Sequence, residues 1–240
     1  MSNMQQVRLQ LKEIEKEVPS INGETPTIIK MGWNHVRFAN LYDDEYISDA
    51  MHEVAGLLLK RTGALFCYIH SDTFILVLPP LLDNTFMGGK LQKLVSSLSS
   101  LATGWMYEYF INNPIDGVDV SAPTFSTKLI DISDIYDVVE YLIWINREAS
   151  VKSIQHLASC HLHFDDVFEK PTDEVIDMLL DEGVDWESKP LFFKGGTFVG
   201  WDSTKIPHIY NVTNYIPFKE LKNKRTTLFD RAEPIQRGGW

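Results

Sequence analysis

The chain has 240 residues, with 22 Lys or Arg and 33 Asp or Glu, and a formal net charge of −11 at pH 7. Hydrophobic residues make up 44% of it, a composition that excludes a disordered or low-complexity protein. No stretch approaches the roughly 18 to 20 apolar residues of a membrane helix, and the N-terminus has no apolar signal-peptide core. We therefore expect a folded cytoplasmic protein without a membrane partner.

Two further features of the composition bear on the cellular compartment and on the possible binding partners. The two cysteines, Cys67 and Cys160, are too few for a disulfide framework and suit a reducing compartment. The excess of acidic residues argues against a broad nucleic-acid-binding surface, although it leaves room for a local basic site.

The first half of the chain alternates strand and helix patterns. Residues 1–24 have the composition of a charged helical segment, and residues 27–31 are the first strong strand. Asp43 or Asp44 can cap a helix that Gly63 ends. The apolar face of this helix repeats at helical spacing and comprises Ile47, Ala50, Met51, Val54 and Leu58.

A hairpin and a second helix follow. Two β-rich runs, residues 64–69 and 74–78, are separated by His70-Ser71-Asp72-Thr73, which is typical of a hairpin turn. Residues 124–130 have the pattern of a fourth strand. The helix that precedes this strand carries its apolar face on Leu91, Leu94, Leu98, Leu101 and Trp105.

The resulting order, β-α-β-β-α-β, is the ferredoxin-like arrangement of the α+β class. We expect one antiparallel sheet with both helices on one face, which would leave the other face free for a ligand. This core would span residues 25–165, after the N-terminal helical segment 1–24. A C-terminal helical and extended extension, residues 166–240, would pack on the core. Helical patterns also occur at residues 135–145, continuing through 151–162, and at 174–180.

The fold alone does not determine a function, but the position of one carboxylate narrows it. Ferredoxin-like palm domains of polymerases and nucleotide cyclases place one carboxylate at the end of the first strand and another in the central hairpin. Two metal ions about 3.5–4 Å apart can bind a triphosphate there. In this chain the hairpin position is Asp72, whereas the end of the first strand is Gly32.

Five segments between residues 25 and 201 form an ordered set. They are Lys30-Met31-Gly32-Trp33, Gly63-Ala64-Leu65-Phe66-Cys67-Tyr68-Ile69-His70-Ser71-Asp72-Thr73, Lys90-Leu91-Gln92-Lys93-Leu94-Val95-Ser96, Tyr141-Leu142-Ile143-Trp144-Ile145-Asn146-Arg147-Glu148-Ala149, and Phe193-Lys194-Gly195-Gly196-Thr197-Phe198-Val199-Gly200-Trp201. In order and spacing this set resembles the motifs of the tRNA-His guanylyltransferase family, the reverse (3′-to-5′) nucleotide polymerases. The resemblance implies a divergent member with a polymerase-palm core.

The resemblance also implies a site and its ligands. Asp72 would be the catalytic carboxylate and a Mg²⁺ ligand, together with backbone atoms of Met31 and Gly32. The partners would be a nucleoside triphosphate, GTP or ATP, with tRNA as a candidate, and the chain would form a homodimer or homotetramer. The nucleotide-binding residues would be Lys30, Arg37, Ser71, Lys90, Lys93 and Ser96.

The family pattern is altered in several places, and one of them is its Trp-Arg-Gln-x-Asp motif, which becomes Trp144-Ile145-Asn146-Arg147-Glu148. Gly32 stands where the family has a metal-binding Asp, Thr73 replaces a Glu, and Lys152 replaces an Asn. Two functions therefore stay open. One is a divergent nucleotidyltransferase that adds nucleotides to the 5′ end of an RNA, with a missing carboxylate supplied from elsewhere. The other is a catalytically impaired nucleotide- or RNA-binding module. Candidates for the missing carboxylate are Asp43, Asp44 and Asp131.

Several of these residues also have structural explanations. Asp72 suits a tight turn by itself, and Lys90 and Lys93 could be solvated residues on the flank of a helix. A cluster of possible zinc ligands lacks a second half with metal-site spacing, and we interpret its members as ordinary helix and turn residues. The cluster comprises His156, Cys160, His161, His163, Asp165 and Asp166.

Overall fold

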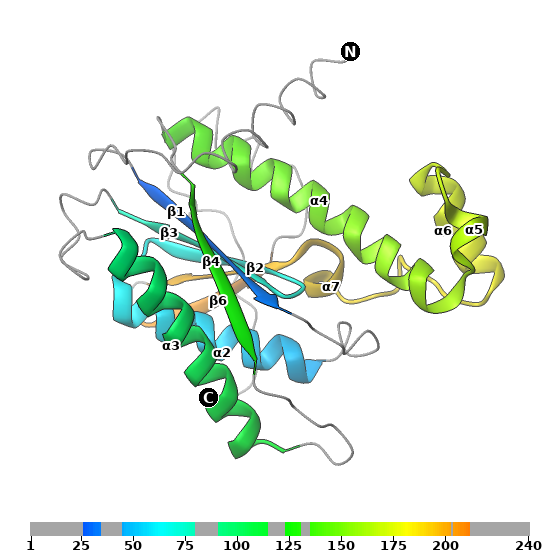
Figure 1. Ribbon diagram of the computed structural model, residues 1–240. Helices are drawn as coiled ribbons and strands as arrows, with labels where there is room; N and C mark the ends of the chain where they lie inside the picture. The colour runs from blue at the N-terminus through cyan, green and yellow to red at the C-terminus, as the bar shows by residue number, and fades with distance from the viewer. Residues whose placement is uncertain are drawn as a thin grey trace.

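One antiparallel sheet organises the part of the chain that the computed structural model describes, residues 26–34, 45–79, 91–114, 123–130, 135–202 and 204–211. Its six strands follow the order β4-β1-β3-β2-β5-β6 (Figure 1). The strands are β1 (Thr27–Asn34), β2 (Phe66–His70), β3 (Thr73–Leu78), β4 (Thr124–Ile130), β5 (Thr197–Trp201) and β6 (Pro207–Asn211). The helices are α2 (Glu45–Thr62), α3 (Leu91–Asn112), α4 (Ile135–His161), α5 (Phe164–Val167), α6 (Thr172–Asp181) and α7 (Leu191–Gly195).

Helices lie on both faces of the sheet: α2 and α3 on one, α4 on the other (Figure 1). Side chains along β1 contribute to the hydrophobic layers on both faces of the sheet, because successive side chains of a strand point to opposite faces. Ile29 and Met31 pack with α2 and α3, whereas Ile28 packs with α4. Tyr68 of β2 and Tyr141 of α4 are fully buried in the second layer. The sheet is therefore covered by two separate hydrophobic layers.

The β-α-β-β-α-β core predicted from the sequence is confirmed. Its four strands follow the order β4-β1-β3-β2, and its two helices share a face. Gly63, with φ of +67°, ends α2 as predicted, because a left-handed backbone conformation favours glycine. The expectation that the second face is free for a ligand is wrong. Val138, Leu142 and Ile145 of α4 form a hydrophobic layer over it.

Two differences concern the C-terminal half. The helical patterns at 135–145 and 151–162 belong to one continuous helix of 27 residues. Strands β5 and β6 come from the predicted extension and complete the sheet that the core begins, since β5 pairs with β2. The N-terminal segment 1–24 lies outside the described residues. Within the described ranges, no helix is long and apolar enough to span a lipid bilayer.

The acidic arm, residues 162–190, contains α5 and α6 and extends beyond the C-terminal end of α4, away from the sheet (Figure 1). It carries ten Asp or Glu and two Lys, which is −8 of the net charge of −11. Leu179 and Val175 of α6 attach it to Leu157 and Ile154 of α4 through a small hydrophobic cluster. The acidity of the chain is therefore concentrated in one appendage.

Candidate functional site

The β2–β3 hairpin brings Asp72 to the end of β1. His70 pairs with Thr73, so the turn consists of Ser71 and Asp72 alone. The backbone N–H of Trp33 donates to the carbonyl oxygen of Asp72 at 2.9 Å, which ties the turn to the neighbouring strand. The hydroxyl of Thr73 donates to Oδ1 of Asp72, also at 2.9 Å. The carboxylate is thus held by its own hairpin.

Strand alternation places a row of residues on the face that α4 covers. Gly32 of β1 is paired with Thr73 of β3 and with Ser126 of β4. Two residues earlier, Lys30 is paired with Lys128. Because Ile28 packs with α4, the side chain of Lys30 and any side chain at position 32 belong to the same face. Two ammonium groups therefore lie on this face, and Lys30 is paired with Ile75, two positions from Thr73 at the hairpin.

A cavity of about 150 Å³ lies between this hairpin and α4. The hairpin contributes three consecutive residues to its wall, α4 contributes one face of its second half, and α7 contributes one aromatic ring. Helical spacing accounts for the α4 residues, which are separated by three or four positions. The lining residues are His70, Ser71, Asp72, Ala149, Lys152, Ser153, His156 and Phe193.

His70 is the polar residue of this wall that the protein leaves unsatisfied. Its side chain is 2% exposed, and neither ring nitrogen has a hydrogen-bond partner within the described structure. Burial, together with the nearby ammonium groups of Lys152 and Lys30, lowers the pKa of His70 to about 3. The ring is therefore neutral at pH 7 and offers one donor and one acceptor. An unsatisfied buried polar group costs about 1–3 kcal/mol, which a ligand or water in the cavity would recover.

Two polar networks position the α4 wall. The side-chain amide of Asn146 donates to the carbonyl oxygen of Gly195 at 2.6 Å and to the hydroxyl oxygen of Tyr68 at 3.1 Å. These bonds join α4 to β2 and to the segment that leads into β5. Buried polar groups that satisfy one another in this way hold the packed elements in one arrangement.

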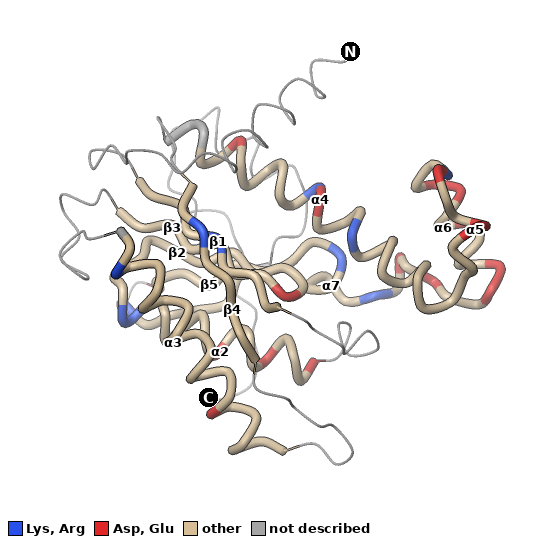
Figure 2. The backbone as a smooth tube through the Cα atoms, in the orientation of Figure 1, with Lys and Arg blue, Asp and Glu red and all other residues tan. Residues whose placement is uncertain are grey.

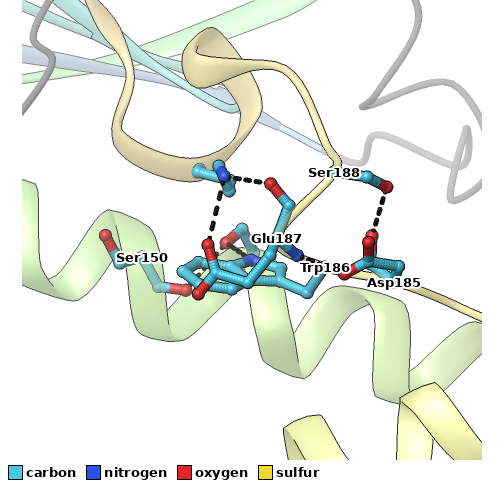
Figure 3. A network of polar contacts seen from close by, with 7 residues as sticks. Ser150, Asp185, Trp186, Glu187 and Ser188 are labelled. Carbon is cyan, nitrogen blue, oxygen red and sulfur yellow. Dashed lines mark hydrogen bonds and ion pairs between the residues drawn. The ribbon is translucent and has the colours of Figure 1, made fainter.

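The second network is shown in Figure 3, where residues near the end of the acidic arm lie against α4. The indole N–H of Trp186 donates to Ser153 Oγ at 2.9 Å, and that hydroxyl donates to the Ser150 carbonyl oxygen at 2.7 Å. Lys194 Nζ lies 5.2 Å from the centre of the Trp186 ring and donates to the Glu187 carbonyl oxygen at 2.5 Å. Ser153, next to Lys152, is thus anchored from outside the cavity.

Charge is distributed unevenly around the site. Figure 2 shows Lys and Arg on β1, in the middle of α4 and on α7, whereas Asp and Glu gather in α5 and α6. Outside the acidic arm the remaining 211 residues carry a net charge of −3, so the fold around the cavity is far less acidic than the whole chain suggests.

Comparison with known proteins places this arrangement in a recognisable fold. No protein-family model and no curated protein sequence matches the chain. A bacterial tRNA(His) guanylyltransferase-like protein solved with ATP superposes with a TM-score of 0.71 at 19% identity, over 92% of this chain and 96% of that chain. The chain has the fold of the tRNA(His) guanylyltransferases.

Two further structures agree with this fold assignment. The tRNA(His) guanylyltransferase of Saccharomyces cerevisiae superposes with a TM-score of 0.65 at 16% identity, over 83% of this chain and 95% of that one. A bacterial tRNA(His) guanylyltransferase-like protein solved with GTP gives a TM-score of 0.59 at 17% identity, over 91% and 95%. The resemblance predicted from the sequence is confirmed at the level of this fold.

Of the predicted site residues, some share one end of the tRNA(His) guanylyltransferase fold and others do not. Lys30, Gly32, Ser71 and Asp72 lie together beside the cavity, as described above. Met31, next in the chain, points to the opposite layer, where it is fully buried. Arg37 and Lys90, and the substitute carboxylates Asp43, Asp44 and Asp131, lie outside the described residues.

Lys93 and Ser96 occupy a different place, at the start of α3. Ser99 of the same helix donates to Thr127 Oγ1 at 2.6 Å, and Thr103 Oγ1 accepts from the Phe125 N–H at 3.3 Å. The helix therefore runs along β4 with its first residues toward the beginning of β1 (Figure 1). Lys93 precedes Ser99 by six residues, about 9 Å, in the direction away from the hairpin. Its assignment to a triphosphate stays a prediction, as does that of Ser96.

The described residues do not fit the two-metal site that the fold implies. Asp72 is the one carboxylate on the hairpin and on the described strands β1 and β4. The carbonyl oxygen of Gly32 already accepts from Ser126 Oγ, at 3.4 Å. Among the residues with described side chains, no three His, Cys, Asp or Glu are placed to hold an ion. Mg²⁺ prefers six oxygen ligands, so Asp72 alone could contribute only to an ion that a nucleotide carries with it.

Four polar residues of the cavity are not among the site residues that the sequence predicts. The sequence places His70 only in a turn, Lys152 only among the departures from the family pattern and His156 only among ordinary helix residues, and it gives no role to Ser153. Their signal was available in principle, because residues 149, 152, 153 and 156 follow helical spacing on one face of α4. The sequence does not indicate that this face of α4 lies next to the hairpin, because it predicts that no helix covers the second face of the sheet.

Proposed function

We propose that this chain binds a nucleoside triphosphate, ATP or GTP, in the cavity between the β2–β3 hairpin and α4. The observation that carries the proposal is the meeting of Asp72 and Lys152 with the buried, unsatisfied ring of His70 in one cavity. Support also comes from two solved proteins of the same fold, one in complex with ATP and one with GTP.

The chemistry of the cavity suits a polyphosphate. Lys152 and Lys30 can neutralise phosphate oxygens, and charge-assisted hydrogen bonds of this kind are shorter and stronger than neutral ones. The hydroxyl group of Ser71 adds a donor. The cavity of about 150 Å³ is small for a whole nucleotide, so the phosphates would occupy it and the nucleoside would extend outward past the hairpin.

Two functions are compatible with this ligand. Phosphoryl and nucleotidyl transfer depend on positioning and on neutralisation of charge, which metal ions usually provide. Gly32 and Thr73 leave Asp72 without the carboxylates that would bind such ions, and they favour a nucleotide- or RNA-binding module with impaired catalysis. The retained Asp72 is the observation that favours the second candidate, a divergent nucleotidyltransferase that adds nucleotides to the 5′ end of an RNA.

The remaining partners belong to the same proposal. A tRNA is compatible with the weakly charged body of the fold, and the acidic arm would repel its phosphates, so an RNA would approach from the side of β4 and β1. We also propose a Mg²⁺ requirement for any transfer reaction, a homodimer or homotetramer, and a cytoplasmic location. Size-exclusion chromatography with light scattering would test the oligomer directly.

Titration calorimetry with ATP and GTP tests the ligand. Lys152→Glu should weaken binding at least tenfold, equivalent to about 1.4 kcal/mol. The control is Lys170→Glu, which makes the same change of charge at an exposed position of the acidic arm. Lys93→Ala tests the prediction from the sequence that Lys93 of α3 binds the triphosphate. If the wild type binds neither nucleotide, the proposed function is wrong.

A transfer assay separates the two candidate functions. The wild type would be incubated with labelled nucleoside triphosphate, a tRNA with a 5′-phosphate and Mg²⁺. The binding module predicts no transfer, or transfer well below about 1 s⁻¹. Transfer at an ordinary enzymatic rate would favour the nucleotidyltransferase and would require a carboxylate from outside the described residues.

A further inference from the structure

The charge at the end of the sheet is the reverse of what a metal-dependent triphosphate site requires. In a metal-dependent site, several carboxylates bind the metal ions, and the metal ions bind the phosphate oxygens. Here Gly32 and Thr73, paired across β1 and β3, carry no charge beside Asp72. The same face of the sheet instead presents lysines.

Two of these lysines come from neighbouring strands. Lys30 and Lys128 are directly opposite each other, and the alternation of side chains puts both on the face that α4 covers. Like charges in directly opposed positions of a sheet repel each other. Both ammonium groups would attract a phosphate group placed between them, and both would repel a divalent cation.

The third lysine faces the sheet from α4. Lys152 lines the cavity together with Asp72, and it is close enough to His70 for its charge to act on the ring. Lys30 lies on β1, two strands from β2, and its charge also acts on the His70 ring. Neither buried nitrogen of His70 has a hydrogen-bond partner within the described structure. A buried imidazole ring without a partner can donate one hydrogen bond to a phosphate oxygen in this cavity.

We propose that Lys30, Lys128 and Lys152 neutralise the nucleotide polyphosphate directly, so that this site binds nucleoside triphosphate without a divalent metal ion. The inference rests on the proposed function and makes it more specific: the ligand is the free nucleotide, recognised through its phosphates. His70 would be a positioning residue that donates one hydrogen bond to a phosphate oxygen.

Calorimetry with ATP in the presence of either EDTA or excess Mg²⁺ tests this directly. We expect a Kd in EDTA equal to or lower than the Kd in Mg²⁺, because Mg²⁺ screens the charge that the lysines recognise. In EDTA, Lys152→Gln and Lys30→Gln should each weaken binding by roughly 10- to 100-fold. Lys170→Gln, on the acidic arm, is the matched control and should bind as the wild type does. Melting temperatures would verify that all variants fold.

A second probe separates phosphate recognition from nucleoside recognition. Inorganic tripolyphosphate in EDTA should compete with ATP, whereas adenosine should not. Binding of ATP only with Mg²⁺, or equal losses in Lys152→Gln and Lys170→Gln, would overturn the metal-independent site and leave the proposed function standing. Failure to bind ATP or GTP under either condition would overturn both.

Discussion

Gly32 is the direct cross-strand partner of Thr73, and the pair lies against the turn that carries Asp72. In the tRNA-His guanylyltransferase family that the sequence resembles, these two positions hold acids. Their replacement by an uncharged pair explains why the described residues provide one carboxylate where a two-ion site would need several. The difference lies in side chains, because the chain has the same fold as a bacterial tRNA(His) guanylyltransferase-like protein.

Gly32→Asp should restore part of the ion-binding site without disturbing the fold. A Cβ atom at this position would meet only Ser126 Oγ, at 4.0 Å, which is an ordinary contact distance. The new carboxylate would face the α4 side, beside Asp72. We expect nucleotide binding to become dependent on Mg²⁺, with Kd in EDTA raised roughly tenfold or more, because the carboxylate repels free triphosphate. Calorimetry with and without EDTA measures the change.

The control for this variant is Gly32→Asn, which has the same shape and no charge. It should leave the Mg²⁺ dependence as in the wild type, and both variants should melt within a few degrees of the wild type. Loss of folding in Gly32→Asn would show that position 32 lacks the space that the structure assigns to it.

Local patterns in the sequence predict the ferredoxin-like core well, for physical reasons. The apolar face of α2 is visible because Ile47, Met51 and Val54 must all reach one layer of the core, and a helix repeats every 3.6 residues. The hairpin is visible because a turn residue such as Asp72 interrupts two runs that are buried on both faces.

The other half of the site depends on long-range packing, which no local pattern encodes. That α4 covers the second face follows from contacts of Tyr68 with Asn146, 78 positions apart in the chain. The net charge is also a poor guide to the surface around the cavity. It is the sum of a strongly acidic arm and a nearly neutral remainder of the chain. The sequence therefore predicts Asp72 at the hairpin but does not indicate that Lys152 lines the same cavity.

Gly196 should tolerate no side chain. Its φ of +75° is a conformation that L-residues rarely adopt, and a Cβ atom would collide with the Ile69 carbonyl oxygen and the Tyr68 hydroxyl. We expect Gly196→Ala to destabilise the protein by roughly 2 kcal/mol or more, from backbone strain and overpacking together. Gly63→Ala is the control, because φ is also positive there but no atom lies within 4 Å of the added carbon. Denaturant titration should show the smaller loss for Gly63→Ala; equal losses would contradict the steric explanation.

The two cysteines should differ in reactivity. Cys67 is fully buried in β2, and burial raises the pKa of its thiol. Cys160 is exposed at the end of α4. Since the thiolate is the nucleophile, iodoacetamide at pH 8 should modify one thiol per native chain and two after denaturation. Cys160→Ser should abolish labelling of the native protein, as mass spectrometry can verify. Labelling of Cys67 at a similar rate would mean that the sheet opens readily.

His70 should make the folded state sensitive to mild acid. Burial and two nearby ammonium groups lower its pKa to about 3 in the folded protein, whereas an unfolded chain titrates near the ordinary value of 6.5. Between these values the unfolded state binds one proton more, so the stability that the neutral ring contributes is complete above pH 6.5 and falls as the pH falls. From pH 6.5 to pH 5 the loss is about 2 kcal/mol at most.

Comparison with His70→Gln isolates this contribution, because glutamine keeps a donor and an acceptor but does not titrate in this range. Other carboxylates and histidines titrate equally in both proteins and cancel in the difference. We expect the free energy of unfolding of the wild type to fall more steeply between pH 7 and pH 5 than that of His70→Gln. Parallel curves would show that the ring is protonated in the folded state, and that the cavity already holds a partner for its positive charge.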